Sequence, residues 1–258
     1  SSTPQQYDTA TVEKRPPVPT VEVAGVIEPV RTVEIKSKAS GEILELGADT
    51  GDTVKRGALL VRIDPRTPRN RVDQAAAQLN AALARSTNAR SQLDRGKKLL
   101  GNAWINQADY DKLVLDAATA ESEVVTARIA VDNSRISLDD TEVRAPSEGT
   151  ILYKKVERGQ VISSPTMDVG GGTLLMTMAD LSRVQARVRV DETDLGKIAP
   201  GMPAAITVAS YPGKRFSGTI EKIEPQAVVE QNVTLFPVLI SLENEERLLR
   251  PGMNVDVR

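Results

Sequence analysis

The chain has 258 residues, a net charge of −2 and an aromatic content of 3%. It contains neither Cys nor His, which excludes thiol nucleophiles, Ser-His-Asp relays and nearly all zinc sites. A net charge so close to zero provides no basic surplus for a nucleic acid, so no nucleic-acid partner is expected. With 40% hydrophobic residues, the chain is expected to fold around an aliphatic core.

Residues 1–17 are polar and rich in Pro, which predicts an extended lead-in left after a signal or anchor was removed. No apolar run approaches the 18 or so residues of a membrane span, so any membrane anchor is expected outside this chain. The chain stops at "PGMNVDVR", in the middle of what looks like a strand, and we expect it to be part of a longer protein.

Residues 33–64 and 141–182 carry the same pattern of short strands and Gly-containing turns. The repeated residues are Gly41 and Gly149, Ile43 and Ile151, Leu44 and Leu152, and Gly51 and Gly159. Neither half can bury its apolar face alone. The repeat therefore predicts a small β-sandwich with pseudo-twofold symmetry, whose two halves are separated by a long insert.

The insert, residues 65–140, has a heptad pattern on both of its arms. The repeated positions are Val72, Leu79, Ser86, Leu93 and Leu100 on the first arm and Tyr110, Ala117, Val124, Val131 and Leu138 on the second. The residues three positions after them are small in most heptads. Sustained heptads predict a coiled coil. Because the link between the arms is short, the two helices should be antiparallel neighbours, each about 45 Å long.

Three sequence signals mark the helix ends. Thr67 followed by Pro68 predicts the start of the first helix, and Gly101 predicts its end. Asn106, with Asp109 three residues later, predicts the cap of the second helix.

After residue 182 the pattern returns to short strands with regular turns, which predicts a small antiparallel barrel over residues 183–258. Residues 18–32 are expected to add a strand to this barrel. Asp191 is expected to cap a single helical turn inside it.

These residues resemble the periplasmic adaptors of bacterial tripartite pumps, the membrane fusion protein or HlyD family. The resemblance rests on "ASGEI…GDTVKRGALLVRID", "DTEVRAPSEGTI…GQVI", "ADLSRVQARVRVDETDLGKIAPGM" and "LLRPGM", in that order, and covers nearly the whole chain. It looks closest to the MacA-like branch. The resemblance implies an elongated multidomain α+β fold, in which a split lipoyl-like β-sandwich with an inserted antiparallel coiled-coil α-hairpin is followed by a small β-barrel.

The resemblance also implies how the domains are divided and with which partners they work. Residues 33–64 and 141–182 would form the lipoyl-like domain, 65–140 the hairpin, and 18–32 with 183–258 the barrel; residues 1–17 would be the remnant of a membrane-proximal domain. The family implies a non-enzymatic periplasmic adaptor without cofactor or metal, attached to the inner membrane. Its implied partners are an inner-membrane transporter of ABC type, or alternatively RND type, a TolC-like outer-membrane channel, and further copies in a ring, expected to be a hexamer.

Family hairpin tips carry an Arg, a Leu four residues later, and a Ser or Thr seven residues beyond. Arg95 and Leu99 match this pattern, whereas Asn106 departs from its last position and leaves open which channel is recognised. Trp104, the only Trp, is expected in the tip loop, either exposed for docking or folded back over the helix ends. Arg95, Leu99 and Asn106 also have ordinary structural explanations as a solvated, a turn-closing and a capping residue.

Gln160, in "RGQVI", matches a Gln that gates the ring axis in MacA-like proteins, although it could be a plain turn residue. Three other functions remain in view: a biotin or lipoyl carrier, a passive tethering coiled coil, and an adaptor that works without an outer channel. A carrier would present a modified Lys at the turn joining its halves, where this chain has its long insert. A tether explains the insert but not the paired β units.

Overall fold

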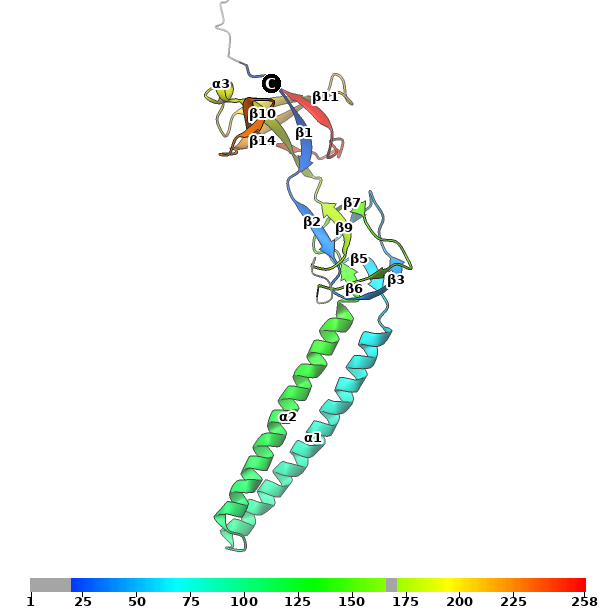
Figure 1. Cartoon of the computed structure of the whole chain (residues 1–258), viewed down its shortest axis with the longest axis vertical. Coiled ribbons are helices and arrows are strands. Elements are labelled where there is room, and N and C mark those ends of the chain that lie inside the picture. The colour runs from blue at the N-terminus through cyan, green and yellow to red at the C-terminus, as the bar shows by residue number, and fades with distance from the viewer. Residues whose placement is uncertain (1–19, 166–170) are drawn as a thin grey trace, which may run out of the picture. The chain divides into compact units, whose positions relative to one another are not determined.

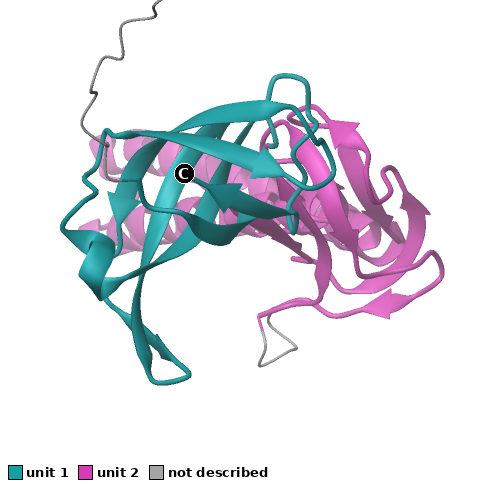
Figure 2. Ribbon diagram, turned by 90° about the horizontal axis from the view of Figure 1, so that it is seen from above, with its two compact units in different colours: residues 1–30, 181–258 teal, residues 31–180 magenta. Residues whose placement is uncertain are grey.

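The computed structural model describes residues 20–165 and 171–258, so the lead-in expected at residues 1–17 lies outside the described part (Figure 1). The chain divides into two compact units, one of residues 31–180 and one of residues 1–30 with 181–258 (Figure 2). The first unit contains a β-sandwich and a helical hairpin, and the second contains a β-barrel.

The sandwich consists of two four-stranded sheets, in the orders β2-β9-β7-β4 and β6-β5-β3-β8. Its strands are β2 (Thr32–Lys36), β3 (Gly41–Leu46), β4 (Thr53–Val54), β5 (Leu59–Ile63), β6 (Glu142–Arg144), β7 (Gly149–Lys154), β8 (Val161–Ile162) and β9 (Leu174–Ala179). Aliphatic side chains from both halves and two methionines from the second half form one core. It includes Ile43, Leu60, Ile63, Ile151, Met176 and Met178. Each sheet contains strands from both sequence repeats, so neither half forms a sheet by itself.

The sequence repeat appears in the structure as equivalent hydrogen bonds between the halves. The N–H of Gly51 donates to the carbonyl of Ile151 at 2.8 Å, and the N–H of Gly159 donates to the carbonyl of Ile43 at 2.8 Å. Gly51 and Gly159 have φ values of 93° and 84°, a region that favours Gly. The predicted pseudo-twofold sandwich is therefore confirmed, and the two turn glycines lock its halves together.

Replacing either of these glycines by Ala is expected to lower the free energy of unfolding by about 1–2 kcal/mol, the usual cost of a positive φ for an L-residue. A Cβ at Gly51 or Gly159 would meet no atom within 4 Å, so the cost should come from the backbone alone and be similar at both sites. Urea denaturation of the single variants measures this. A loss confined to one of them would show that the halves are not energetically equivalent.

Helices α1 (Arg66–Gly101) and α2 (Gln107–Asp139) form the hairpin. The buried residues of both helices all lie at the predicted heptad positions: Ala75, Ala82, Ser86, Gly96, Ala117, Ala120 and Val131. Most of them are small, so the helices can approach closely. Two ion pairs cross between the helices, Arg85–Glu123 at 2.9 Å and Arg90–Glu121 at 2.7 Å.

Both predicted ends of α1 are wrong, each by one or two residues. The helix begins at Arg66 rather than after Thr67, because the carboxylate of Asp64 accepts the N–H of Arg66 at 3.0 Å and Pro65 has no N–H to satisfy. The guanidinium of Arg66 also donates to this carboxylate, at 2.6 Å, and it lowers the pKa of Asp64 below its usual value, with a smaller contribution from the backbone N–H. At the other end Gly101 is the last helical residue, and Ala103 rather than Gly101 takes the left-handed conformation, with φ of 58°.

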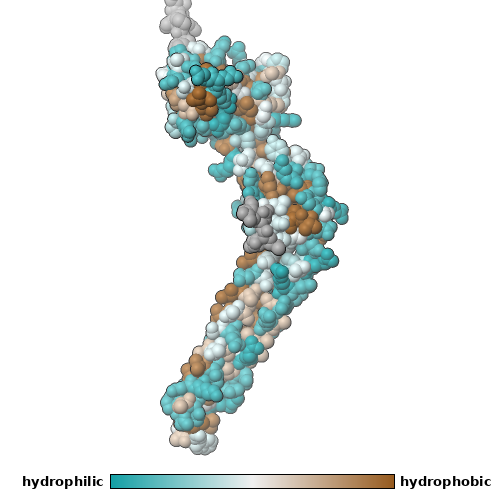
Figure 3. All heavy atoms as spheres, in the orientation of Figure 1, coloured by the Kyte–Doolittle hydropathy of each residue, from teal (hydrophilic) through white to brown (hydrophobic). Residues whose placement is uncertain are grey.

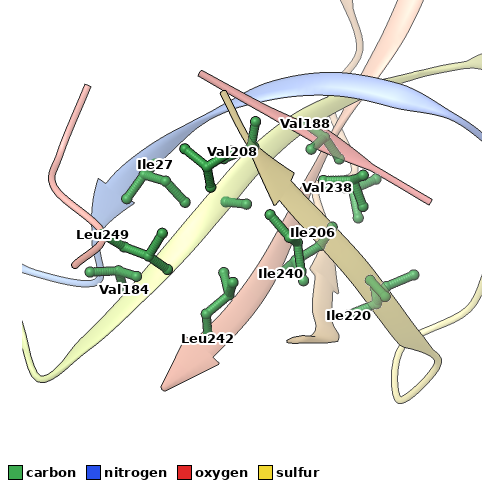
Figure 4. Packing of buried hydrophobic residues seen from close by; sticks show 14 of the residues in the cluster. Ile27, Val184, Val188, Ile206, Val208, Ile220, Val238, Ile240, Leu242 and Leu249 are labelled. Carbon is green, nitrogen blue, oxygen red and sulfur yellow. The ribbon is translucent and has the colours of Figure 1, made fainter. Parts of the chain in front are cut away.

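Six strands close the barrel in the order β10-β1-β15-β11-β12-β14, since β10 also pairs with β14. They are β1 (Val23–Pro29), β10 (Arg183–Asp191), β11 (Pro203–Val208), β12 (Arg215–Ile223), β14 (Val233–Glu243) and β15 (Asn254–Val257), and β13 (Val228–Glu230) extends β14 as a hairpin. Figure 4 shows branched aliphatic side chains, among them Ile27, Ile206 and Ile240, filling the barrel interior. The expected strand from residues 18–32 is confirmed as β1.

Helix α3 (Glu192–Leu195) follows β10 in the barrel unit. The carboxylate of Asp191 accepts the N–H of Thr193 at 2.8 Å, which confirms the predicted cap and lowers the pKa of Asp191. Within residues 20–165 and 171–258, every helix is too short or too polar to cross a membrane.

Candidate functional site at the hairpin tip and the Gln160 turn

The hairpin tip is closed by a backbone motif at the end of α1. The N–H of Trp104 donates to the carbonyl of Leu99 at 2.9 Å, and the N–H of Ala103 donates to that of Leu100 at 2.9 Å. With Ala103 in the left-handed conformation, these bonds form a Schellman motif, which satisfies carbonyls that the helix end leaves unpaired. The motif joins two of the predicted tip residues, Leu99 and Trp104, by a direct hydrogen bond.

The predicted tip residues differ in exposure. Trp104 is 75% exposed, so its indole does not fold back over the helix ends as the structural alternative required. Arg95 is exposed, and its guanidinium has no ion pair within the described part of the chain, whereas Leu99 is half-buried. The side chain of Asn106 accepts the N–H of Asp109 at 2.8 Å, which confirms the cap of α2. The tip loop thus presents an exposed indole, and the last turns of α1 carry a cation without an ion pair among the described residues.

Gly96 explains how α2 comes close to α1 just before the tip. A Cβ at Gly96 would collide with Cδ1 of Leu113 and lie 3.9 Å from Cδ1 of Ile105. Ile105 is half-buried, unlike its neighbour Trp104. The loop therefore holds one apolar residue against the helices and leaves the other exposed to solvent.

Ala103 stores backbone strain that a Gly would relieve, because L-residues rarely adopt a positive φ. We expect Ala103→Gly to raise the free energy of unfolding of the hairpin by about 0.5–1 kcal/mol, after the larger entropy of the unfolded Gly is taken into account. Thermal unfolding followed by circular dichroism at a helical wavelength measures the gain. A loss of stability would show that the methyl group of Ala103 makes a contact worth more than the strain.

Gln160 lies in the turn between β7 and β8, next to Gly159. Its side-chain oxygen accepts the N–H of Glu157 at 3.1 Å, and its backbone carbonyl accepts the N–H of Ile43 at 2.9 Å. The turn is therefore held by Gln160 itself. Its side-chain nitrogen has no partner among the described residues, and the next residue, Val161, is 76% exposed.

Comparison with known proteins identifies the family to which this architecture belongs. A model of the barrel-sandwich hybrid domain of RND membrane fusion proteins matches residues 31–189, and a model of the CusB-like β-barrel domain matches residues 183–258. The chain belongs to the membrane fusion protein family. The resemblance inferred from the sequence is thereby confirmed, as is the predicted fold class.

Individual relatives place this membrane fusion protein among MacA-like adaptors. The macrolide export protein MacA of Yersinia pestis is 29% identical over 98% of this chain and 71% of its own length. AcrA, a multidrug efflux pump subunit of Escherichia coli K12, is 28% identical over 96% of this chain and 64% of its own length. A crystal structure of a MacA-MexA chimera with the Pseudomonas aeruginosa MexA hairpin superposes with a TM-score of 0.69 and 26% identity, over 92% of this chain and 77% of the chimera.

Proposed function

We propose that the chain is a periplasmic adaptor subunit that links an inner-membrane ABC-type transporter to a TolC-like outer-membrane channel for efflux or secretion. The observation that carries this proposal is a MacA-like fold in which a two-helix arm ends in an exposed Trp104 and an unpaired Arg95. Exposed Trp and Arg side chains are the residue types most enriched in protein-binding hot spots. In this proposal Arg95, Leu99, Trp104 and Asn106 dock on the channel.

The other parts of the chain have structural roles in the proposed assembly. The lipoyl-like domain, residues 33–64 and 141–182, forms a homo-oligomeric ring, proposed to be a hexamer. Gln160 faces the ring axis, where its free amide N–H groups bond to neighbouring copies and narrow the conduit. The barrel, residues 18–32 and 183–258, lies toward the inner membrane, to which the adaptor is attached.

The type of transporter has a specific alternative. Both matching family models describe domains of RND or CusB-like adaptors, and the identity to AcrA, 28%, is close to the 29% identity to the Yersinia MacA. An RND-type pump is therefore the second candidate. The MacA core of the superposed chimera favours the ABC type.

An enzymatic role is not proposed. Carriers of biotin or lipoate present a modified Lys at the turn that joins the two halves of the domain. Here the halves are joined by the whole hairpin, and helices α1 and α2 occupy that place. A passive tether is also disfavoured, because a tether needs only the coiled coil and does not explain the pseudo-twofold sandwich.

Reconstitution with candidate partners tests the proposal. The adaptor would be mixed with a TolC-type channel and with either an ABC-type or an RND-type transporter from the same cell, and the assemblies imaged by electron microscopy. We expect a channel-capped assembly with the ABC transporter. The same assembly with only the RND pump would overturn the transporter assignment, and a transporter complex that never includes the channel would favour an adaptor that works without one.

A further inference from the structure

The turn at Gln160 has a counterpart at Asp52, in the first half of the sandwich. The side-chain oxygen of Gln160 accepts the N–H of Glu157 at 3.1 Å, and a carboxylate oxygen of Asp52 accepts the N–H of Asp49 at 2.8 Å. The backbone carbonyls of Gln160 and Asp52 accept the N–H groups of the two repeated isoleucines, each at 2.9 Å. The same backbone thus carries two different side chains, and each turn is a control for the other.

The comparison of the two turns shows which part of Gln160 the fold requires. The turn requires only a hydrogen-bond acceptor at this position, because the carboxylate of Asp52 makes the same bond as the amide oxygen of Gln160. The amide of Gln160 adds a nitrogen with two donor hydrogens. This nitrogen makes no hydrogen bond with any residue that the structure describes, and the side chain is exposed. The turn therefore holds the amide by its oxygen and leaves two donors for a partner.

The residue that follows each turn also differs between the two halves. Val161, next to Gln160, is an aliphatic side chain that is 76% exposed. Its counterpart Thr53 is polar, and its hydroxyl lies within hydrogen-bond distance, 3.3 Å, of the hydroxyl of Thr150 on the neighbouring strand. The second half thus places an apolar surface beside hydrogen-bond donors, where the first half has polar groups that bond to each other.

The outer face of β3 enlarges this apolar surface. Glu42 lies opposite Val161 in the strand pairing, and Leu44, two residues later, is 38% exposed. Side chains two residues apart share one face of a strand, so Leu44 lies diagonally across from Val161. Arg158, in the same turn, is exposed, and its charge offsets that of Glu42. Figure 3 shows hydrophobic side chains at the surface of the sandwich among hydrophilic ones. We call Gln160, Val161 and Leu44 the amide–aliphatic site.

A molecule that fits the amide–aliphatic site has an apolar body and a hydrogen-bond acceptor. The two aliphatic side chains favour an apolar body, because contact between them removes apolar area from water. The amide nitrogen of Gln160 can only donate, and the amide oxygen is already bonded to the N–H of Glu157. The polar group of the ligand must therefore accept, as a carbonyl does, whereas an ammonium group has donors only.

We propose that the amide–aliphatic site contacts the transported molecule and selects apolar molecules that carry a hydrogen-bond acceptor. This inference rests on the proposed function, in which Gln160 faces the conduit, and it adds the chemical class of the substrate. In the empty ring the amide donors bond to neighbouring copies, and the acceptor of a passing molecule takes the place of those copies.

Nuclear magnetic resonance of the full chain tests the proposal, because all three residues of the site lie in one copy. The chain would carry heavy nitrogen in its glutamines and heavy carbon in its Val and Leu methyl groups. It would be titrated with cyclohexanone, a neutral apolar ring with one carbonyl. We expect saturable shifts of the Gln160 side-chain amide and of the methyl groups of Val161 and Leu44. Leu152, the counterpart of Leu44 in the other half, is the matched control, and its methyl groups should not shift.

Two further probes separate the apolar contact from the hydrogen bond. Acetone has the carbonyl without the ring, and cyclohexylammonium has the ring with donors only. Each lacks one of the two contacts, so each should bind about threefold or more weakly than cyclohexanone. Equal affinity for cyclohexanone and cyclohexylammonium would overturn the proposal, as would the absence of a shift at Gln160. This comparison uses the unaltered chain and does not depend on the folding of a variant.

Two variants introduce residues that the counterpart turn already carries. Gln160→Asp removes the amide donors and should weaken cyclohexanone binding, followed through the Leu44 methyl groups, by about three- to tenfold. Val161→Thr removes one methyl group and should weaken it by about fourfold. Asp52→Asn alters the other turn and should leave binding within about twofold of wild type, because distant sites act independently. Unchanged binding to both site variants would contradict the proposal.

Imaging of the same chain with the channel and the transporter separates this inference from the proposed function. Shifts at the amide–aliphatic site without a channel-capped assembly would support the ligand class and count against the proposed function alone. A channel-capped assembly from a chain whose Gln160 amide does not respond to cyclohexanone would leave that function intact and overturn the inference.

Discussion

Replacing Arg95 by Asp is expected to weaken binding of the adaptor to the proposed outer-membrane channel strongly. The guanidinium is exposed and makes no ion pair in the described chain, so its charge is free for a partner. Reversing a charge at a docking surface removes one attraction and adds a repulsion, and hot-spot residues of this kind contribute about 2 kcal/mol or more. We therefore expect binding to the immobilised channel, measured by surface plasmon resonance, to weaken at least about thirtyfold.

Arg71→Asp provides the matched control for this prediction. Arg71 is also an exposed, unpaired Arg of α1, but it lies near the base of the helix, far from the tip. Its reversal should leave channel binding within about twofold of wild type, because the charge is distant from the docking surface. Helicity of both variants, measured by circular dichroism, should be unchanged. Equal losses for the two variants would indicate long-range attraction by α1 and contradict a docking role for Arg95.

Replacing Asn244 by Ala is expected to cost the barrel about 3 kcal/mol of unfolding free energy. Asn244 is 3% exposed, and its side-chain nitrogen donates to the carbonyls of Leu181 and Leu249 at 2.9 and 2.8 Å. Its side-chain oxygen accepts the N–H of Leu249 at 3.0 Å. Truncation removes three hydrogen bonds and leaves their partners unsatisfied beside the core residue Leu249. Urea denaturation of the purified chain measures the loss.

Two further variants show whether the hydrogen bonds are the cause. Asn244→Asp keeps the size but cannot donate to two carbonyls when ionised, so it should be at least as destabilising as Ala at neutral pH. Asn88→Ala, at an exposed position on α1, should change stability by less than about 0.5 kcal/mol. If Asn244→Asp were as stable as wild type, the bonds to Leu181 and Leu249 would contribute little.

The sequence by itself determined the architecture, because each element has a strong local signal. The heptads of the insert specify a seam of small residues, and those residues are the buried ones of α1 and α2. The 108-residue repeat of Gly51 at Gly159 predicts two equivalent turns, since few residues other than Gly adopt their φ values. Periodicity and turn glycines are properties of short segments, and they can therefore be read without the fold.

Helix ends were less predictable, because several residues compete for the same backbone groups. The carboxylate of Asp64 took the first N–H of α1 in preference to Thr67, and the left-handed position fell on Ala103 rather than on Gly101. Both outcomes depend on how the chain enters and leaves the helix. That path is set by the sandwich at one end and by the return of α2 at the other.

Only the tertiary structure decided which surfaces are free. From the sequence, the indole of Trp104 could have been either exposed or packed. The turn closed by the hydrogen bond from the Trp104 N–H to the carbonyl of Leu99 leaves the indole in solvent. Ile129 reads like any other aliphatic residue of a coiled coil, yet it points away from the only helix that could cover it within the described chain. The reason is physical: burial depends on what lies across from a side chain, and a residue's own neighbours in sequence do not contain that information.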